Sequence, residues 1–500
     1  MEHIANLIKV LRERDGMTQS EFAKKLGTTQ SVIARIEKGE QNLTADMITK
    51  ISEVLGKNLV QVNENGALNI QIEGGKKLSG TIVTKTSKNG AVGLLCASLL
   101  NRGKTTLRSV PKIEEVHRLI EVLESIGVSI KWIGNDLEIK TPEKISLKKL
   151  NKESAIRTRS IIMFIGPLIH HMKNFALPQA GGCKLGSRTV RPHFYALENI
   201  GVNIETTKDE YRVSAEKLKA NEIVLYESGD TVTENILMAS ALIPGITTIK
   251  FASANYQVQE MCFLLERLGV KIDGIGTSTL TVHGLSEIRE NIEYTLAEDP
   301  IDSMFFLACA IVANSSITIE RAPIDFLEIE LLKLEKMGFK YKILKKYVSH
   351  NGFTKLVDIK TLPSKLTALE EKIHPNVYPG LNMDNLPFFA VIATQAEGTT
   401  FLHDWVYEKR AIHYKELDKL GADTLLADPH RIYITGPTKL KPAEVICPPA
   451  LRPAAIILIG MLGANGTSIL RNIYSINRGY EDIVKRLNSI GAKIKILNEL

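Results

Sequence analysis

LESIGVSI at residues 123–130 is the first of six related stretches that decide the fold of this 500-residue chain. Each copy has a helix-prone turn, then a glycine, then a β-prone segment. The other copies are LENIGVNI (197–204), LERLGVKI (265–272), LEKMGFKY (334–341), LDKLGAD (417–423) and LNSIGAKI (487–494). A glycine just after the last helical turn often adopts the left-handed conformation and ends the helix. We therefore expect six helix ends, each followed by a strand.

The spacing of the copies indicates how these units are assembled. Their glycines are separated by 74, 68, 69, 83 and 70 residues. A tight turn into a threonine-rich strand precedes most copies, as at Gly103, Gly245, Gly398 and Gly466. Units of about 70 residues are longer than the common solenoid repeats. We interpret them as six α/β units packed in two groups of three.

Residues 1–60 precede the repeats and have a different pattern. Four short amphipathic helices are expected there, the first over about 4–14 and the last over about 44–56. Thr18 and Glu21 have the spacing of a capping box at the start of the second helix. Gly27 would end that helix, and Thr29 would begin the third. The short connection predicts a helix-turn-helix.

This stretch resembles the Cro/repressor helix-turn-helix family over residues 3–60. The resemblance implies that Gln30, Ser31 and Arg35 contact base edges in the major groove. Gln19 and Asn42 would contact phosphates, and two copies would bind a palindromic site as a homodimer. Residues 1–60 contain nine Lys or Arg and eight Asp or Glu, so strong nonspecific binding is not expected. A docking or dimerisation module is the alternative.

Bulk composition narrows the class of protein. The chain is 44% hydrophobic with a net charge of +7, which suits a globular protein with an anionic partner. No apolar run reaches the roughly 18–20 residues of a membrane span, and the longest, 454–464, predicts a buried helix. The first residues do not resemble a secretion signal. With five widely spaced cysteines and no metal-ligand or disulfide pattern, we expect a cytoplasmic protein without a bound metal.

One loop carries the chemistry: PQAGGCKLGSRTVRPH at residues 178–193. Its Cys183 is surrounded by Lys184, Arg188 and Arg191, and nearby cations favour the reactive thiolate. The other four cysteines lie in apolar segments and are expected to be core residues: Cys96, Cys262, Cys309 and Cys447.

This loop, together with the six repeats, resembles the UDP-N-acetylglucosamine enolpyruvyl transferase family from about residue 66 to 500. The resemblance implies an inside-out α/β fold of two domains with three repeats each and an active site in the cleft. Residues 71–87 with 298–500 would form domain I, and 88–297 domain II, with the catalytic loop at 178–193. Residues 61–70 would be a linker to the all-α helix-turn-helix domain at 1–60.

The resemblance also implies an activity. The family transfers the enolpyruvyl group of phosphoenolpyruvate to the 3-hydroxyl of UDP-N-acetylglucosamine and releases phosphate, in the first committed step of peptidoglycan synthesis. The family needs no cofactor and no membrane. The matching catalytic residues are Cys183, Asp384 and Lys88. The matching substrate-binding residues are Asn89, Arg159, Arg188, His193, Arg410, Arg452 and Arg478.

These residue types suit that reaction. Guanidinium groups can clamp the carboxylate and phosphate of phosphoenolpyruvate in a bidentate way. Asp384 would take the proton of the attacking sugar hydroxyl as a general base. Cys183 would protonate the methylene carbon or bond transiently to the enolpyruvyl unit.

Departures from the family pattern lie mostly on the nucleotide-sugar side. The family has proline and aspartate where this chain has Thr189 and Arg191, and residues 179–180 are an insertion. Other substitutions are Ala450 for an aspartate, Pro300 for an arginine, and Asn255 and Gln257 for two glutamates. Two alternatives follow. The chain could use another nucleotide or sugar nucleotide, or it could be a ligand sensor that controls the helix-turn-helix with weak or no turnover.

Overall fold

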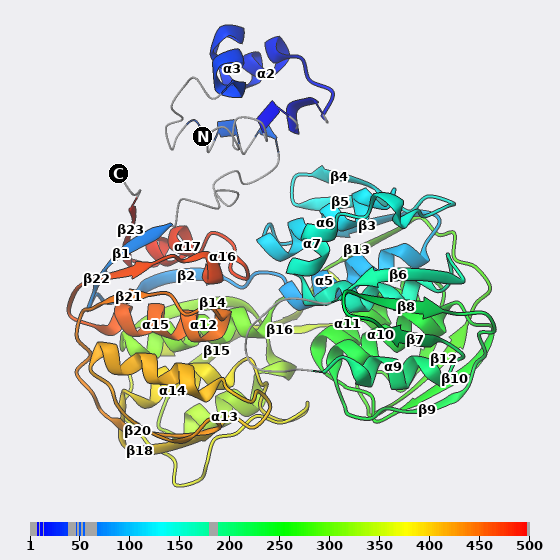
Figure 1. Ribbon diagram of the computed structural model, residues 1–500. Coiled ribbons are helices and arrows are strands. Elements are labelled where there is room, and N and C mark those ends of the chain that lie inside the picture. The colour runs from blue at the N-terminus through cyan, green and yellow to red at the C-terminus, as the bar shows by residue number, and fades with distance from the viewer. Residues whose placement is uncertain are drawn as a thin grey trace. The chain divides into compact units, whose positions relative to one another are not determined.

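The computed structural model describes residues 8, 9, 11–13, 15–38, 47, 50, 51, 54, 55, 68–179 and 189–497. The chain forms two compact units (Figure 1). One contains residues 1–69 with 497–500, and the other contains residues 70–496.

The N-terminal unit contains the predicted pair of helices, α2 (Gln19–Leu26) and α3 (Gln30–Glu37). Thr18 Oγ1 accepts the Glu21 backbone N–H at 3.2 Å, and the Glu21 carboxylate accepts the Thr18 N–H at 2.8 Å. Gly27 follows α2 in the left-handed conformation. These observations confirm the capping box and the turn. The core of this unit is made of Ile8, Leu11, Phe22, Ala23, Leu26, Ile33, Ile36, Ile51 and Leu55.

A buried ion pair fixes α3 in this unit. Arg12 and Glu37 are 6% and 9% exposed, and Arg12 Nε lies 2.5 Å from Glu37 Oε1. Gln19 Nε2 donates to the other Glu37 oxygen at 2.8 Å. Because a buried carboxylate is costly unless it is paired, this contact holds α3 against the first helix and α2.

The larger unit contains six separate sheets in its described residues. Three use strands from residues 88–297. In strand order they are β13 (Ile292–Thr295), β3 (Lys104–Arg108), β5 (Asp136–Lys140) and β4 (Ser129–Ile133); β6 (Asn174–Pro178), β8 (Glu210–Ser214) and β7 (Asn203–Thr206); and β11 (Lys271–Asp273), β12 (Thr279–Gly284), β10 (Gly245–Lys250) and β9 (Glu222–Val224).

The other three sheets use the remaining strands. They are β15 (Lys340–Val348), β16 (Lys355–Leu362), β14 (Ser316–Pro323) and β2 (Ser79–Val83); β17 (Leu366–Thr367), β18 (Ala396–His403), β20 (Arg431–Gly436) and β19 (Asp423–Asp428); and β21 (Glu444–Ile446), β22 (Gly466–Arg471), β1 (Asn69–Gly74) and β23 (Lys493–Leu497). The last sheet takes β1 between two strands of the sixth repeat. β1 starts at Asn69, inside the segment that was expected to be a linker.

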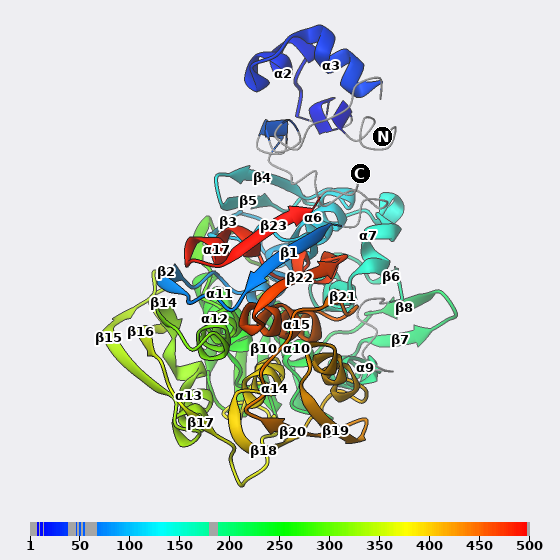
Figure 2. The ribbon, with the colours of Figure 1, turned by 90° about the vertical axis from the view of Figure 1, so that its left-hand side faces the viewer.

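Helices fill the middle of each half of the larger unit, where one half is residues 88–297 and the other is the rest of the unit. In residues 88–297, the inner helices are α5 (Lys88–Ala97), η4 (Arg159–Phe164) with α8 (Ile165–Leu168), and α10 (Asp230–Ala241). In the other half they are α12 (Pro300–Val312), α14 (Leu386–Ala393) and α15 (Leu451–Gly463). Within each half the three inner segments contact one another, and the strands surround them (Figure 1, Figure 2). This is the predicted inside-out arrangement, and the buried helix expected over 454–464 corresponds to α15, which ends at Gly463.

The remaining elements are shorter or lie outside the inner helices. They are η2 (Ser98–Leu100), α6 (Glu114–Ser125), η3 (Leu147–Lys149), α7 (Lys152–Arg157), α9 (Arg191–Glu198), α11 (Tyr256–Arg267), η5 (Ile324–Phe326), α13 (Glu328–Lys336), η6 (Ala411–Leu420), α16 (Tyr474–Asn477) and α17 (Ile483–Ser489).

The six repeat glycines have the predicted backbone conformation. Their φ angles are 103°, 93°, 92°, 94°, 80° and 95° for Gly127, Gly201, Gly269, Gly338, Gly421 and Gly491. Each follows a helix and precedes a strand. The expectation of six helix ends is therefore confirmed.

Two crossing segments join the halves of this unit, and they pair with each other. Thr86 and Glu298 form an isolated antiparallel bridge. The Ser87 N–H donates to the Ala297 carbonyl at 2.8 Å, and the Asp299 N–H donates to the Lys85 carbonyl at 2.8 Å. α5 begins directly after the first crossing and α12 directly after the second.

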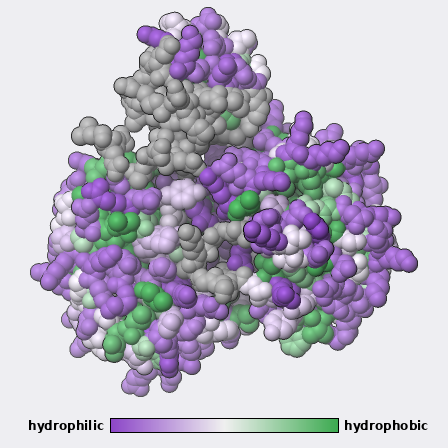
Figure 3. Space-filling model, viewed as in Figure 1, coloured by the Kyte–Doolittle hydropathy of each residue, from purple (hydrophilic) through white to green (hydrophobic). Residues whose placement is uncertain are grey.

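The surface is largely polar on the face shown in Figure 3, with small separate apolar patches. Among the described helices, none has the length and apolar character needed to cross a membrane.

Candidate active site

Asp384 lies between two buried arginines. It precedes α14, and its backbone N–H donates to Asn382 Oδ1 at 2.9 Å. Its carboxylate oxygens lie 3.3 Å from Arg452 Nη2 and 3.7 Å from Arg410 Nη1. Burial by itself would raise the pKa of Asp384, but Arg452, Arg410 and Lys88 outweigh it, so the pKa lies below its ordinary value. The group is therefore an ionised carboxylate at neutral pH.

Arg410 is held rigidly by its surroundings. Its Nε and Nη2 donate to the two carboxylate oxygens of Asp404 at 2.6 and 3.0 Å, and Nη2 also donates to the Met383 carbonyl at 2.6 Å. Tyr414 donates to the same Asp404, and the Tyr407 ring lies 4.1 Å from the guanidinium carbon. Only its Nη1 points to Asp384. Arg410 is 1% exposed, so most of its hydrogen-bonding capacity is spent within the protein.

Arg452 lies in the first turn of α15. Its Nη1 donates to Tyr480 Oη at 2.8 Å, and Nη2 donates to Asp384. Ala450, at the position of the family's aspartate, is the residue that precedes α15. It packs in a small apolar cluster with Tyr407, Met383 and Val406. No carboxylate therefore stands at position 450 beside Arg452.

Lys88 and Arg478 meet at a carboxylate that no local motif in the sequence marks. Glu115 Oε2 accepts from Lys88 Nζ at 3.1 Å and lies 3.8 Å from Arg478 Nη2. Burial would raise the pKa of Glu115, but Lys88 and Arg478 hold it below the ordinary value. The sequence gives one hint: two glutamates begin α6 directly after the turn at residues 111–113.

The remaining predicted residues lie around this cluster. Asn89 Nδ2 donates to Tyr256 Oη at 3.1 Å, and the charges of Asp384 and Arg452 both act on the Tyr256 hydroxyl. Arg159 Nη2 donates to the Thr189 carbonyl at 3.4 Å, at the end of the predicted catalytic loop. The structure thus brings the residues from four repeats into one region.

His193 is a core residue of α9. It is 6% exposed, with Nδ1 3.1 Å from Asn235 Nδ2 and Nε2 3.4 Å from Thr231 Oγ1. Burial, with a smaller contribution from the charge of Arg159, lowers its pKa to about 3, so the ring is neutral. These contacts orient α9 at the end of the loop.

Cys183 and Arg188 lie outside the described residues. The other four cysteines are buried, as expected. Burial raises the pKa of Cys447 to about 12 and also raises the pKa of the other three thiols. None of these four is poised to react as a thiolate.

In the N-terminal unit, Gln30, Ser31 and Arg35 are all exposed on α3. Gln19 donates to Glu37, as described above, and Asn42 lies outside the described residues. The exposed side chains of α3 thus include the three that were expected to reach base edges.

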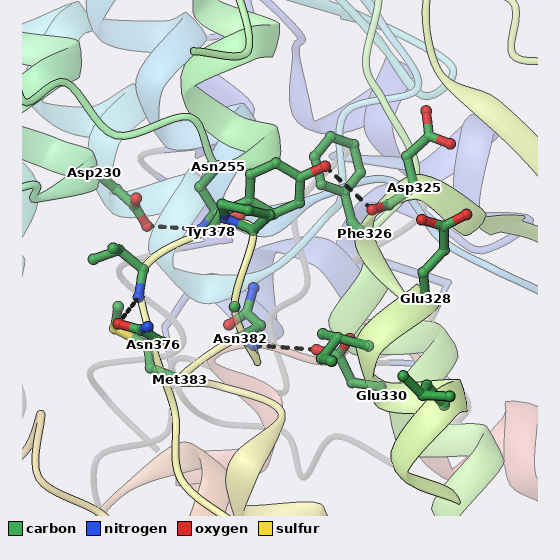
Figure 4. A pocket seen from close by; sticks show the side chains of 15 residues that line it. Asp230, Asn255, Asp325, Phe326, Glu328, Glu330, Asn376, Tyr378, Asn382 and Met383 are labelled. Carbon is green, nitrogen blue, oxygen red and sulfur yellow. Dashed lines mark hydrogen bonds between the residues drawn. The ribbon is translucent and has the colours of Figure 1, made fainter. Parts of the chain in front are cut away.

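A cavity of about 250 Å³ opens next to the segment that leads to Asp384. Figure 4 shows the side chains that line it. Asn382 and Met383, the two residues before Asp384, line one side of it. Asp230 and Asn255 line it from residues 88–297, and α13 lines it from the other half. Among these residues only Asn255 stands out in the sequence, as a departure from the family pattern.

Comparison with known proteins agrees with this architecture. A family model described as EPSP synthase (3-phosphoshikimate 1-carboxyvinyltransferase) matches residues 72–487, and a helix-turn-helix model matches residues 8–62. The UDP-N-acetylglucosamine 1-carboxyvinyltransferase of Treponema denticola is 33% identical over 429 residues, covering 85% of this chain and 98% of that protein. The protein of the same name from Bradyrhizobium diazoefficiens is 32% identical over 431 residues, covering 86% of this chain and 98% of that protein.

Solved structures show the same fold. The enolpyruvyl transferase NikO from Streptomyces tendae superposes with a TM-score of 0.72 at 21% identity, covering 87% of this chain and all of that one. The predicted fold and family are both confirmed. The chain therefore belongs to the enolpyruvyl (1-carboxyvinyl) transferase family and carries an additional N-terminal helix-turn-helix domain.

Proposed function

We propose that this protein transfers the enolpyruvyl group of phosphoenolpyruvate to a hydroxyl of a UDP-amino sugar and releases phosphate. UDP-N-acetylglucosamine, which the names of the curated relatives specify, is the first candidate acceptor. With that acceptor the reaction would be the first committed step of peptidoglycan synthesis. The observation that carries the proposal is the ionised Asp384, which two arginines hold directly after the cavity-lining residues Asn382 and Met383.

The chemistry assigns one task to each group. Asp384 takes the proton of the acceptor hydroxyl while the hydroxyl oxygen bonds to C2 of phosphoenolpyruvate. C3 gains a proton at the same time, and the family resemblance assigns that proton to Cys183. Loss of phosphate from C2 and of a proton from C3 then restores the double bond. Positioning both substrates against fixed charges supplies much of the rate enhancement.

Cationic groups suit the anionic donor. Arg452 and Lys88 lie close enough to lower the pKa of Asp384, and Arg478 joins Lys88 at Glu115. The carboxylate and phosphate of phosphoenolpyruvate would bind among these cations in charge-assisted hydrogen bonds. Arg410, already bound to Asp404, would orient Asp384 more than it contacts the donor.

The test is phosphate release from phosphoenolpyruvate in the presence of UDP-N-acetylglucosamine. Asp384→Asn keeps the shape of the side chain but cannot accept the proton, so turnover should fall by roughly 10²- to 10⁴-fold. Asp423→Asn, at an exposed position of β19, is the matched control. Near-normal turnover in Asp384→Asn would exclude the general-base role.

The same assay separates the alternatives. Release of phosphate only with another nucleotide or sugar nucleotide would favour a paralogous transferase. Tight binding of nucleotide sugars without release from any of them would favour a sensor, in which the enzyme fold regulates the helix-turn-helix.

We further propose that the N-terminal unit binds DNA as a dimer. Its support is the exposure of Gln30, Ser31 and Arg35 together on α3.

A bidentate contact from arginine to guanine contributes about 1–3 kcal/mol of discrimination. Selection of bound sequences from a random DNA pool by the full-length protein should yield a palindromic motif. Arg35→Ala should weaken that motif, while Lys9→Ala should leave it unchanged; enrichment of no motif would indicate a docking module.

A further inference from the structure

The cavity beside Asp384 has strongly acidic walls. Asp230 lines it on one side, and Asp325, Glu328 and Glu330 line it on the other (Figure 4). The described residues that line it include four carboxylates and no lysine, arginine or histidine. This contrasts with the cluster of arginines around Asp384 itself.

Two of these carboxylates are bonded only to neutral groups. Asp230 accepts hydrogen bonds from Ser253 Oγ at 2.6 Å and from Asn255 Nδ2 at 2.9 Å. Glu330 is 1% exposed, and its Oε1 accepts from the Asn382 N–H at 3.1 Å and from Asn385 Nδ2 at 2.8 Å. Glu330 Oε2 is buried and has no hydrogen-bond partner among the described residues. Neither carboxylate forms an ion pair with any described cation.

Such carboxylates are costly to bury without a cation. Burial raises the pKa of Glu330 to about 6 and also raises the pKa of Asp230. Two side-chain donors of the wall are already used, since Asn255 donates to Asp230 and the Tyr378 hydroxyl donates to the Asp325 carbonyl at 3.3 Å. Asp325 pairs with the exposed Lys355 at 3.3 Å. Three of the four lining carboxylates therefore have no ion-pair partner among the described residues, and a ligand that donates hydrogen bonds and carries positive charge would complement them.

The position of the cavity indicates which part of a substrate would enter it. Asn382 and Met383 line it directly before Asp384, and the charge of Asp384 acts on the lining residue Asp230. A group whose hydroxyl reaches Asp384 would therefore lie in or next to the cavity. A volume of about 250 Å³ is below the roughly 300–1,000 Å³ of pockets that enclose a whole drug-sized ligand. It suits one sugar ring and excludes a complete nucleotide sugar.

We propose that this cavity binds the sugar ring of the acceptor through a free, protonated amino group, so that the preferred acceptor is an unacylated amino sugar. The inference rests on the proposed transferase function. An ammonium group brings three donors to Asp230 and a positive charge that offsets the charges of Glu328 and of the buried Glu330. An N-acetyl group instead brings a carbonyl oxygen, which the carboxylates cannot pair with, and loses the charge.

The direct test compares two acceptors that differ only in this group. Calorimetry at pH 7 with phosphoenolpyruvate present would measure the Kd of the full-length protein for UDP-glucosamine and for UDP-N-acetylglucosamine. We expect the free amine to bind at least about tenfold more tightly, as charge complementarity favours. Equal binding, tighter binding of the N-acetyl sugar, or binding of neither sugar would overturn the inference.

Three variants locate the effect. Asp230→Asn removes one charge with little change in shape, and Glu328→Gln removes another at an exposed position of α13. Each should reduce the preference for the amine to less than about half of its wild-type value. Glu335→Gln lies on the same helix, outside the cavity lining, where its carboxylate accepts from Tyr341 Oη at 2.6 Å. It should keep the full preference, and an equal effect in all three variants would contradict the assignment.

Phosphate release measured in parallel separates this inference from the proposed function. Turnover with UDP-N-acetylglucosamine and no preference for the amine would leave the transferase function standing and overturn the inference. A clear preference for binding the amine, without phosphate release in the presence of either sugar, would support the inference and overturn the transferase function.

Discussion

Four cations of the candidate site already have a carboxylate partner within the protein. Arg410 is bound to Asp404, Arg452 to Asp384, and Lys88 and Arg478 meet at Glu115. These pairings fix the side chains in place before any substrate arrives, which reduces the ordering that binding would require. They also set the protonation states on which single substitutions should act.

The ionisation of Asp384 should depend on Arg452. Arg452→Gln removes a cation that opposes the effect of burial, so the pKa of Asp384 should rise. A general base must be ionised to act. As the pH is lowered, Arg452→Gln should therefore lose activity at a higher pH than the unmodified protein does. We expect the acid limb of the kcat/KM profile to move upward, in addition to any drop in its maximum. Arg431→Gln, which loses only an exposed pair with Asp428, should leave the limb in place. An identical acid limb in both variants would contradict this coupling.

Cys183 should be the thiol that an epoxide phosphonate such as fosfomycin alkylates. The sequence surrounds it with cations, whereas the other four thiols are buried and have raised pKa values. Mass spectrometry should find the adduct on the peptide that contains Cys183. Cys183→Ser should abolish labelling, and Cys96→Ser should not. An adduct mainly on another cysteine would refute the prediction.

Among the individual residues of the site, those within short recognisable motifs could be predicted from the sequence. The residues that pair with them could not. Asp384, Arg452 and Lys88 could be placed because short family patterns surround them. Glu115 lies 27 residues from Lys88, and Tyr256 lies 167 residues from Asn89. Lys88 and Glu115 meet within the first repeat, and Asn89 and Tyr256 come from different repeats. Tertiary packing brings both pairs together, so no local pattern could reveal them.

The six repeats predicted the secondary structure elements better than their connections. The left-handed glycines and the inner helices follow from residue type and period, because helix ends require that conformation locally. The insertion of β1 into the sheet of the sixth repeat does not follow. That pairing joins residues 70 and 470, and no property of either strand alone specifies the other.

Two of the repeat glycines should differ in their tolerance of a side chain. A Cβ at Gly201 would lie 2.3 Å from the Lys217 carbonyl oxygen, whereas at Gly127 the nearest atom would be a side-chain carbon of Pro142 at 3.6 Å. Both would pay roughly 1–2 kcal/mol for the left-handed conformation, and only Gly201→Ala would also have to move backbone. Thermal unfolding should show a clearly larger drop in Tm for Gly201→Ala than for Gly127→Ala. Equal drops would mean that backbone conformation alone sets the cost.

The candidate site as a whole is divided between the two halves of the larger unit. Lys88 and Glu115 come from residues 88–297, and Asp384, Arg452 and Arg478 come from the rest. Away from the site, the rings of Phe263 and Phe353 stack across the halves, with centroids 4.0 Å apart. Contacts of this kind should help to keep the two sets of residues in register.

Phe353→Ala should therefore affect substrate binding more than chemistry. An aromatic pair contributes about 0.5–1.5 kcal/mol beyond its buried area. We expect the KM for the acceptor to rise by roughly two- to tenfold, which corresponds to that energy, with a smaller change in kcat. Phe401→Ala removes a similar stack with Tyr433 within one half and is the control. Unchanged KM values in Phe353→Ala would show that the stack has no part in aligning the site.

The paired crossings near Thr86 and Glu298 have a mechanical consequence. Two strands held together by backbone hydrogen bonds form a ribbon, which bends across its flat face more easily than it shears within its plane. Such a joint would favour rotation of the two halves about one axis. Lys88 is the first residue of α5, immediately after the joint. A ligand that binds Lys88 would therefore also pull on the segment about which the halves rotate. Binding of a ligand at the site would then be coupled directly to rotation of the two halves about the joint.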